Sequence, residues 1–365
     1  MNIKKITSFL NSKFPFSTQE SYDNSGIILQ FDEEIINNVL ITLDITQEVI
    51  DEAIEKHINL IISHHPIIFS GIKKLSTLKA QDRVIIGAIQ HKISIIAMHT
   101  NIDNSIDGVN GRIAQILNLQ NIEILKPLKN SLYKIITYTP NDYSGIIREV
   151  LFASGAGQIG NYSNCSFNSL GEGTFKALEN STPFIGQKNS IHFEPETKIE
   201  AIIPNHLLES AIQNLKSVHP YEEVAYDIIP LQNTNTQVGS GIIGNLEKEM
   251  DPIEFFALLK TKLPISIIKH SPICTATISK IAYCGGSGSF LIEDAKKQKA
   301  DVYITGDLKY HDFFETENTI ILADIGHFES EQHTIDIIYD VLIKKFPNFA
   351  ILKSGINTNP IQYYL

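Results

Sequence analysis

Short apolar runs alternate with amphipathic segments in the first third of the chain. Runs at 38–43, 59–63 and 93–98 are rich in isoleucine, leucine and valine and have the length of strands. The segments at 46–57 and 77–91 between them place apolar residues at helical spacing. Apolar strands that alternate with helices are typical of a parallel sheet covered on both faces. The pattern therefore predicts an α/β fold for this part of the chain.

The last third of the chain repeats this rhythm. Strand-like runs lie at 280–284, 301–305 and 319–324, with a helical segment at 290–300 and a glycine-rich turn, GGSGS, at 285–289. β-Branched runs bounded by turn residues are typical of strands. The two ends of the chain therefore predict two related α/β halves with mainly parallel sheets, brought together as one domain.

The middle of the chain has another order of elements. A strand, a helix, a Gly/Ser/Asn-rich stretch, a strand, a helix and a strand are expected at 132–139, 143–153, 155–175, 198–204, 205–217 and 222–230. This order is typical of a ferredoxin-like α+β module. We interpret the module as an insert, which divides the chain into 1–127, 128–245 and 246–365.

Gly155, Gly157 and Gly160 match the G-x-G-x-x-G pattern of dinucleotide-binding folds. In those folds the pattern follows a strand and opens a helix, whose N-terminus binds the pyrophosphate. Here it follows an expected helix and leads into NYSNCSF. Turn glycines are the better interpretation.

Composition narrows the class of protein. The 365 residues carry a net charge of −11, three cysteines and no C-x-x-C pair, which argues against a nucleic-acid surface, a disulfide framework and a thiolate metal site. No apolar run approaches the roughly 18 residues of a membrane span, and the N-terminus is interpreted as an ordinary first helix rather than a signal peptide. We expect a cytoplasmic protein whose metal sites, if present, use histidine and carboxylate.

Metal-binding residue types follow four of the expected strands within a few positions. They are His64 and His65, His99 and Asp103, Asp307 and His311, and His327 and Glu331. In open α/β sheets, ligands bind at the carboxyl ends of the strands, so these side chains are expected at one edge. Histidine with carboxylate and no sulfur suits zinc, manganese, iron, cobalt or nickel.

The local sequence supports two of these pairs as ligands. His327 and Glu331 lie one turn apart at the start of an expected helix and therefore share a face. Successive residues of a strand face opposite ways, so His64 and His65 can serve one site only if the chain turns there. Pro66 restricts His65 and ends strand pairing, which favours such a turn.

Each of these features also has a simpler structural interpretation. A single histidine at a strand end is more often hydrogen-bonded or solvated than a ligand, and the Thr-Gly-Asp sequence at 305–307 suits a tight turn capped by Asp307. The GGSGS sequence at 285–289 could hold a phosphate through its N–H groups, although it lacks the lysine of a P-loop.

Five motifs in order resemble the signatures of the NIF-three-like family, whose members are described as GTP cyclohydrolase one type two homologues. They are SYDNSGI at 21–27, SHHP at 63–66, HTNID at 99–103, TGDLKYHD at 305–312 and DIGHFESE at 324–331. The middle of the chain, with HPYEEVAYDI at 219–228, resembles the PII- and CutA-like insert of the longer bacterial members. Tyr22 stands where the family usually has tryptophan.

The resemblance implies two divalent metal ions per subunit, of open identity, within a ring-shaped homohexamer. Matched motif by motif, the implied metal ligands are His64, His65, Asp103, His327 and Glu331. His99, Asp307 and His311 match the other polar positions of the cavity and are candidate acid–base residues.

Two ions with a bridging carboxylate favour hydrolysis, in which a bridging water loses a proton near neutral pH and becomes the nucleophile. The expected function is a metal-dependent hydrolase acting on a nucleotide-like or other small substrate, with GTP cyclohydrolase chemistry as one case and no membrane or nucleic-acid partner. The alternative is a non-catalytic, metal-binding regulatory or scaffold ring protein.

Overall fold

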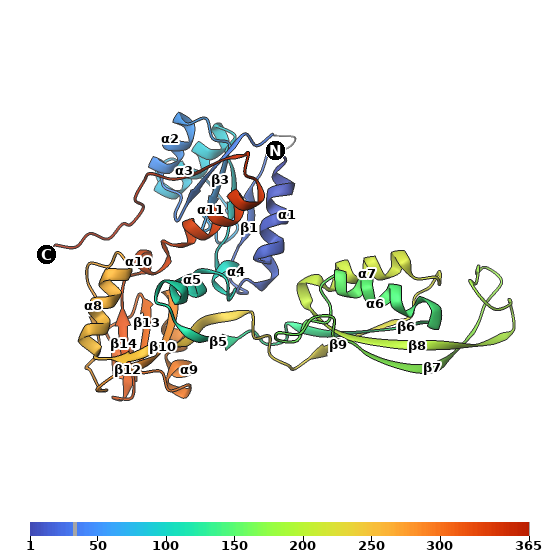
Figure 1. Ribbon diagram of the computed structural model, residues 1–365. Helices are drawn as coiled ribbons and strands as arrows, with labels where there is room; N and C mark the ends of the chain where they lie inside the picture. Colours follow the sequence, from blue (N-terminus) through green and yellow to red (C-terminus); the bar gives the residue numbers. More distant parts are fainter. Residues whose placement is uncertain (32–34, 365) are drawn as a thin grey trace. The chain divides into compact units, whose positions relative to one another are not determined.

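The computed structural model describes residues 1–31 and 35–364. The chain divides into two compact units, shown in Figure 1. Unit 1 contains Met1–Pro127 and Gln237–Leu365, and unit 2 contains Leu128–Thr236. Among the described residues, no helix combines the length and the apolar character needed to cross a membrane.

The first sheet of unit 1 has five strands in the order β1-β4-β3-β2-β15. Strands β2, β3, β4 and β15 run parallel, and β1 pairs antiparallel with β4. Their bounds are Gly26–Leu29 (β1), Asn38–Thr42 (β2), Leu60–Ser63 (β3), Ser94–Ala97 (β4) and Ala350–Lys353 (β15). The mainly parallel sheet expected from the apolar runs is confirmed here.

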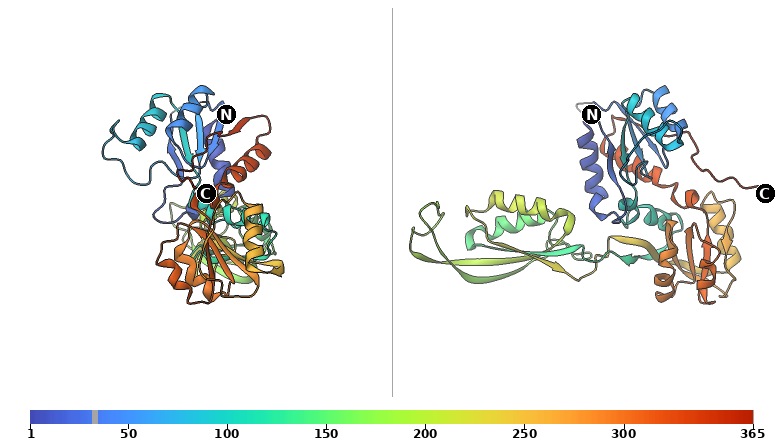
Figure 2. Two further views of the ribbon diagram at one scale, coloured as in Figure 1. Left: turned by 90° about the vertical axis from the view of Figure 1, so that its left-hand side faces the viewer. Right: turned by 180° about the vertical axis from the view of Figure 1, so that it is seen from behind.

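Both faces of this sheet are covered by helices, as the views of Figure 2 show. Alternate residues of one strand face opposite sides, so Ile62 packs with α1 and α11, whereas Ile61 packs with α2 and α3. The helices span Ile3–Lys13 (α1), Gln47–Glu55 (α2), Ala80–Gln90 (α3) and Thr334–Lys345 (α11). Coverage of both faces explains why the strands are apolar throughout.

The second sheet of unit 1 has six strands in the order β11-β14-β13-β12-β10-β5 and is mixed. β12, β13 and β14 run parallel, whereas β5, β10 and β11 each pair antiparallel. The bounds are Gln120–Pro127 (β5), Gly239–Met250 (β10), Lys269–His270 (β11), Ile278–Ser287 (β12), Val302–Gly306 (β13) and Ile321–Asp324 (β14). The expectation of a mainly parallel sheet is wrong here, because β5 and β10 form an antiparallel ladder.

Helices cover the second sheet as well. Val109–Ile116 (α5) and Pro252–Lys262 (α8) pack on one face, and Ile292–Lys297 (α9) packs on the other. Elements cross between the two ends of the chain: α11 and β15 come late in the sequence but belong to the first sheet, whereas α5 and β5 come early and belong to the second. Neither end of the chain builds a sheet alone.

Unit 2 has a four-stranded antiparallel sheet in the order β7-β8-β6-β9, with α6 and α7 packed on one face (Figure 1). The bounds are Leu132–Pro140 (β6), Ser144–Ala153 (α6), Phe167–Lys176 (β7), Ile191–Pro204 (β8), Asn205–Val218 (α7) and Tyr226–Leu231 (β9). The end of the insert that was expected from the sequence, residue 245, falls inside Gly239–Met250 (β10). The compact unit ends earlier, at Thr236, because β10 already pairs within unit 1 from Gly239 onward.

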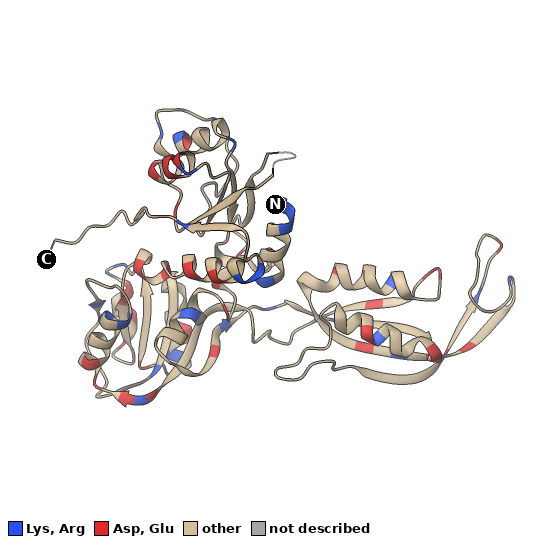
Figure 3. Cartoon of the chain, turned by 45° about the horizontal axis from the view of Figure 1, so that its top comes forward, with Lys and Arg blue, Asp and Glu red and all other residues tan. Residues whose placement is uncertain are grey.

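The glycines of the G-x-G-x-x-G pattern lie in a turn. Gly157 has φ +79°, and a Cβ there would come within 2.7 Å of the Cys165 carbonyl oxygen. Its N–H donates to the Ile202 carbonyl at 2.7 Å, and the next element after the pattern is β7, a strand. The turn interpretation is confirmed, since no helix opens there to receive a pyrophosphate. Figure 3 shows acidic and basic residues interleaved in both units.

We predict that unit 1 folds without unit 2. Pro127 and Gly239 are register partners of the β5–β10 ladder, so a linker of about four residues in place of Leu128–Thr236 closes a hairpin that is already paired. Circular dichroism and thermal unfolding should show a cooperatively folded protein.

The matched control removes 128–245 with the same linker. This deletion takes away half of β10 and should abolish cooperative unfolding, because β10 joins β5 to β12. Cooperative folding of the longer deletion alone would contradict the structural boundary.

Candidate metal centre

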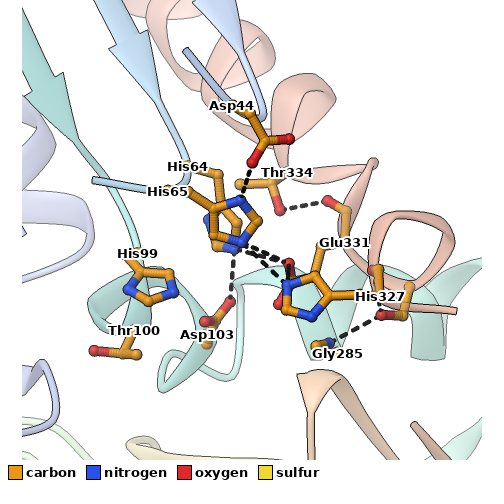
Figure 4. Close-up of polar contacts among 12 residues, drawn as sticks. Asp44, His64, His65, His99, Thr100, Asp103, Gly285, His327, Glu331 and Thr334 are labelled. Carbon is orange, nitrogen blue, oxygen red and sulfur yellow. Dashed lines mark hydrogen bonds and ion pairs between the residues drawn. The ribbon is translucent and has the colours of Figure 1, made fainter. Parts of the chain in front are cut away.

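Side chains from the strand ends of both sheets meet in unit 1, as Figure 4 shows. His64 and His65 follow β3, Asp103 ends α4 (Thr100–Asp103), and His327 and Glu331 lie on α10 (His327–Glu331). They form overlapping groups whose possible ligand atoms lie within 4.8 Å of one another: His64, Asp103 and Glu331; His65, His327 and Glu331; and His64, His65 and His99. These residues lie close together at the carboxyl ends of strands, as expected from the sequence, but the strands belong to two sheets and not to one.

The two adjacent histidines reach one site because the chain leaves the sheet at His64. The N–H groups of His64 and His65 both donate to the Leu43 carbonyl, at 3.1 and 3.0 Å, which turns the backbone. Their ring centroids lie 4.7 Å apart with the planes tilted by 51°. The turn expected before Pro66 therefore exists, and both rings face the same cluster.

His64 is fully buried and has one ring nitrogen without a partner. Nδ1 lies 2.7 Å from the Met98 carbonyl oxygen, which only accepts, so Nδ1 carries the proton and Nε2 keeps its lone pair. Nε2 faces Asp103 Oδ1 at 3.8 Å and Glu331 Oε2 at 3.5 Å, and Asp103 Oδ1 also lacks a hydrogen-bond partner. Burial of unpartnered acceptors is costly, and a cation between His64 Nε2 and Asp103 Oδ1 would satisfy both.

His65 and His327 share one oxygen of Glu331. Each Nε2 lies 3.0 Å from Glu331 Oε2, and the two Nε2 atoms lie 3.2 Å apart. Burial lowers the pKa of His65, but hydrogen bonds to Asp44 and Glu331 outweigh it and raise the pKa to about 10. Burial likewise lowers the pKa of His327, and Glu331 and Asp307 raise it to about 9. Without a bound cation, both imidazoles are therefore protonated and donate to the Glu331 carboxylate.

The two carboxyl groups of the cluster titrate in opposite directions. Burial raises the pKa of Glu331, but the neighbouring histidines, His64 first, hold it well below its usual range. Burial and the charge of Glu331 raise the pKa of Asp103 well above its usual range. Two carboxylates this close repel each other, so the full donor set becomes anionic only when positive charge is added. The residues therefore fit a metal site of nitrogen and oxygen donors.

The GGSGS segment, expected as a turn, begins as the last three residues of β12; it packs against Glu331 and does not form a phosphate cradle. The N–H groups of Gly285, Gly286 and Gly288 donate to the side chains of Asn110, Ser330 and Thr305 at 2.9 Å each. Gly286 has φ +64°, and a Cβ there would come within 2.2 Å of Glu331 Oε1. The segment is glycine-rich because the carboxylate needs that space.

Two of the three candidate acid–base residues reach the cluster. The His99 ring centroid lies 5.3 Å from those of His64 and His65, and Asp307 Oδ2 lies 2.7 Å from His327 Nδ1. His311 is exposed, contacts the rings of Tyr310 and Phe314, and is not among the described residues that line the cavity. His311 directly precedes the short 3₁₀ helix that begins at Asp312, and its role as an acid–base residue stays a prediction.

Two carboxylates that were not expected from the sequence orient histidines of the site. Asp44 Oδ1 lies 2.7 Å from His65 Nδ1, and Asp23 Oδ1 lies 2.7 Å from His99 Nδ1. Burial raises the pKa of both carboxyl groups, but hydrogen bonds from the histidines lower it below the usual range. Asp44 ends the NVLITLD run, so the strand-end rule could have found it.

The cluster opens into a cavity of about 540 Å³. Tyr22, Phe69 and Phe290 line it and remain 67%, 50% and 53% exposed. None of the described lining residues is a lysine or an arginine. The cavity thus combines acidic and imidazole groups with three accessible aromatic faces.

Comparison with known proteins places the chain in a family. Residues 1–360 match the model of Duf34/NIF3 (NGG1p interacting factor 3). The chain is 40% identical over 369 residues to a "GTP cyclohydrolase 1 type 2 homolog" of Bacillus subtilis (strain 168), covering all of this chain and 99% of that one. It is 38% identical over 368 residues to a protein of the same name from Staphylococcus aureus (strain MSSA476), with both chains fully covered.

Solved structures agree with the sequence comparison. A crystal structure of a Bacillus cereus protein related to NIF3 superposes with a TM-score of 0.87 at 34% identity, covering 99% of this chain and 98% of that one. Reduced HcgD from Methanocaldococcus jannaschii has the same fold, with a TM-score of 0.60 at 16% identity over 98% of each chain. The full-length match and the shared fold lead to one conclusion: the chain belongs to the Duf34/NIF3 family.

Proposed function

We propose that this protein is a metal-dependent hydrolase with two divalent ions held side by side. The observation that carries the proposal is the position of Glu331 Oε2, which lies 3.0 Å from the Nε2 atoms of His65 and His327 and 3.5 Å from that of His64. One carboxylate oxygen is thus common to two groups of donor atoms. A bridging carboxylate of this kind is typical of dinuclear hydrolytic sites.

The donor groups assign a ligand set to each ion. His64, Asp103 and Glu331 form the buried group, and His65, His327 and Glu331 form the more accessible group. Cys284 lines the same cavity, but burial and then the charges of Asp103 and Glu331 raise the pKa of its thiol, so it stays protonated. A set of imidazole and carboxylate donors suits zinc, manganese, iron or cobalt.

Divalent ions held there would polarise the substrate and activate water. The chain itself orients the rings: the Met98 carbonyl, Asp44 and Asp307 accept from Nδ1 of His64, His65 and His327. Each Nε2 is therefore the atom that would bind a cation, which at His65 and His327 would replace a proton. His99 is oriented in the same way by Asp23 and is assigned as the acid–base residue. The Asp23 carboxylate holds the orientation of the imidazole, so that Nε2 is the ring atom left to exchange a proton.

The cavity favours a small substrate with a planar ring. Tyr22, Phe69 and Phe290 offer exposed aromatic faces beside the donor groups, and such faces stack on flat heterocycles. A nucleotide-like substrate, as the name of the relatives indicates for them, is the first class to test. Since no lysine or arginine lies among the described lining residues, a phosphate would depend on the metal ions for its countercharge.

Unit 2 is proposed to be a ferredoxin-like inserted domain. Its element order, strand-helix-strand-strand-helix-strand, and its sheet order β7-β8-β6-β9 support this proposal. Phe167, Leu170, Ile191 and Phe193 on β7 and β8 are 69%, 81%, 66% and 58% exposed. Exposed apolar side chains in this number support self-association, with the ring-shaped homohexamer implied by the resemblance as the expected assembly.

We predict different metal losses for a shared and an unshared ligand. Glu331→Gln should reduce the content from about two ions per chain to nearly none, because both groups use this carboxylate. Asp103→Asn should leave about one ion, since only the buried group loses a donor. Mass spectrometry on protein purified without a metal-affinity tag measures both contents.

Exposed His91→Ala is the matched control and should keep the parental metal content. Thermal unfolding of each metal-free variant separates ligand loss from misfolding. Two retained ions in a folded Glu331→Gln variant would refute the ligand assignment.

We predict chelator-sensitive hydrolysis that depends on His99. In a screen of nucleotides, including GTP, and of other small esters and amides, His99→Asn should lower kcat by about 10²- to 10⁴-fold, the usual contribution of an acid–base residue. The variant should keep both metal ions, whereas His311→Ala should keep full activity because it lies outside the cavity lining. Two bound ions without turnover of any substrate would favour the regulatory or scaffold alternative.

A further inference from the structure

We propose that the C-terminal segment positions a metal ligand, with Thr358 as the positioning residue for His65 through Asp44. The segment 354–359, here called the C-terminal strap, follows β15 and contains no helix or strand. The inference rests on the proposed metal site, since it concerns how one of its histidines is held.

The strap reaches His65 through a short chain of hydrogen bonds. Thr358 Oγ1 donates to Asp44 Oδ2 at 2.8 Å, and Asp44 Oδ1 accepts from His65 Nδ1 at 2.7 Å. The two oxygens of one carboxylate are therefore fixed from opposite sides. His65 Nε2 then points at Glu331 Oε2, at 3.0 Å.

Asp44 needs this second anchor because its carboxylate is accessible. The Asp44 side chain is 35% exposed, whereas His65 is 19% exposed. A carboxylate held by one hydrogen bond at a wet edge can rotate and exchange its partner for water. Thr358 removes this freedom, so the orientation of the imidazole is defined before a cation binds.

The strap also holds the helix that carries the other ligands. Asn359 Nδ2 donates to Glu329 Oε1 at 3.0 Å, and Glu329 lies on α10 between His327 and Glu331. Helix α10 has five residues, too few to be stable by its own hydrogen bonds. Thr358 of the strap thus contacts Asp44, which orients His65, and the next residue, Asn359, contacts Glu329 on α10.

The strap adds little to the hydrophobic core. Ser354 Oγ and the Gly355 N–H donate to Glu52, so this anchor is polar as well. Ile356 is its one large apolar side chain and is 37% exposed. Loss of the Thr358 contact should therefore change the metal site more than the stability of the fold.

The test compares Thr358→Val, which removes the hydroxyl at nearly constant shape, with Thr358→Ser, which keeps it. Zn²⁺ affinity is measured on the full chain by competition with a chromophoric chelator, and the absorption spectrum of the Co²⁺ form reports ligand geometry. Thr358→Val should weaken Zn²⁺ binding by about 10- to 100-fold, the usual effect of losing a group that supports a ligand. It should also alter the Co²⁺ spectrum, whereas Thr358→Ser should match the parent.

Asp44→Asn provides a second variant upstream in the same chain and should weaken Zn²⁺ binding at least as much. Parental affinity and spectrum in Thr358→Val would overturn the strap proposal alone, provided that Glu331→Gln loses metal in the same assay. Equal Zn²⁺ affinity of the parent and Glu331→Gln would instead overturn the metal site itself. If the metal-free Thr358→Val protein also melted at a lower temperature than the metal-free parent, the weaker Zn²⁺ binding would reflect loss of stability. Thr358 would then be a structural residue, and its positioning role would be overturned.

Discussion

The buried carboxylate of Glu331 is the constraint on which the arrangement of unit 1 depends. Its side chain is 4% exposed, and an ionised carboxylate at such a site is costly unless hydrogen bonds or charges compensate for lost water. Two imidazoles, His65 from the end of β3 and His327 from the same helix as Glu331, provide this compensation at 3.0 Å each. The strand ends of the two sheets must therefore lie close together. The late elements α11 and β15 pack in the first sheet and the early elements α5 and β5 in the second, so both ends of the chain hold the two sheets together.

The polar network around the cluster is graded in accessibility. His64 is fully buried and held by a backbone carbonyl, whereas His65 and His327 are partly exposed and held by the side chains Asp44 and Asp307. Ligands held by the main chain move only with the sheet, while those held by side chains respond to their own supports. The buried group thus provides rigidity, and the accessible group faces the cavity where a substrate would enter.

Much of this could be predicted from the sequence because two local rules apply. Apolar runs locate the strands, and the strand-end rule collects His64, His65, Asp103, His327 and Glu331. The sequence could not show that β15 joins the first sheet, because a short apolar run does not specify its partner. It also could not show that His311 contacts Tyr310 and Phe314, since spacing in a motif does not determine which way a loop side chain turns. Asp44 follows a strand and could have been found by the same rule, whereas Asp23 has no spacing signature as an orienting carboxylate.

Gly286 leaves no room for a side chain beside the Glu331 carboxylate. Its backbone adopts a left-handed conformation, and its missing side chain is the space that Glu331 Oε1 fills. Mutation of this codon to alanine would add one methyl group, strain the end of β12 and displace the Glu331 oxygen. Such an allele would keep all five family motifs while moving the carboxylate that the proposed metal site shares, a change that inspection of the motifs alone would not reveal.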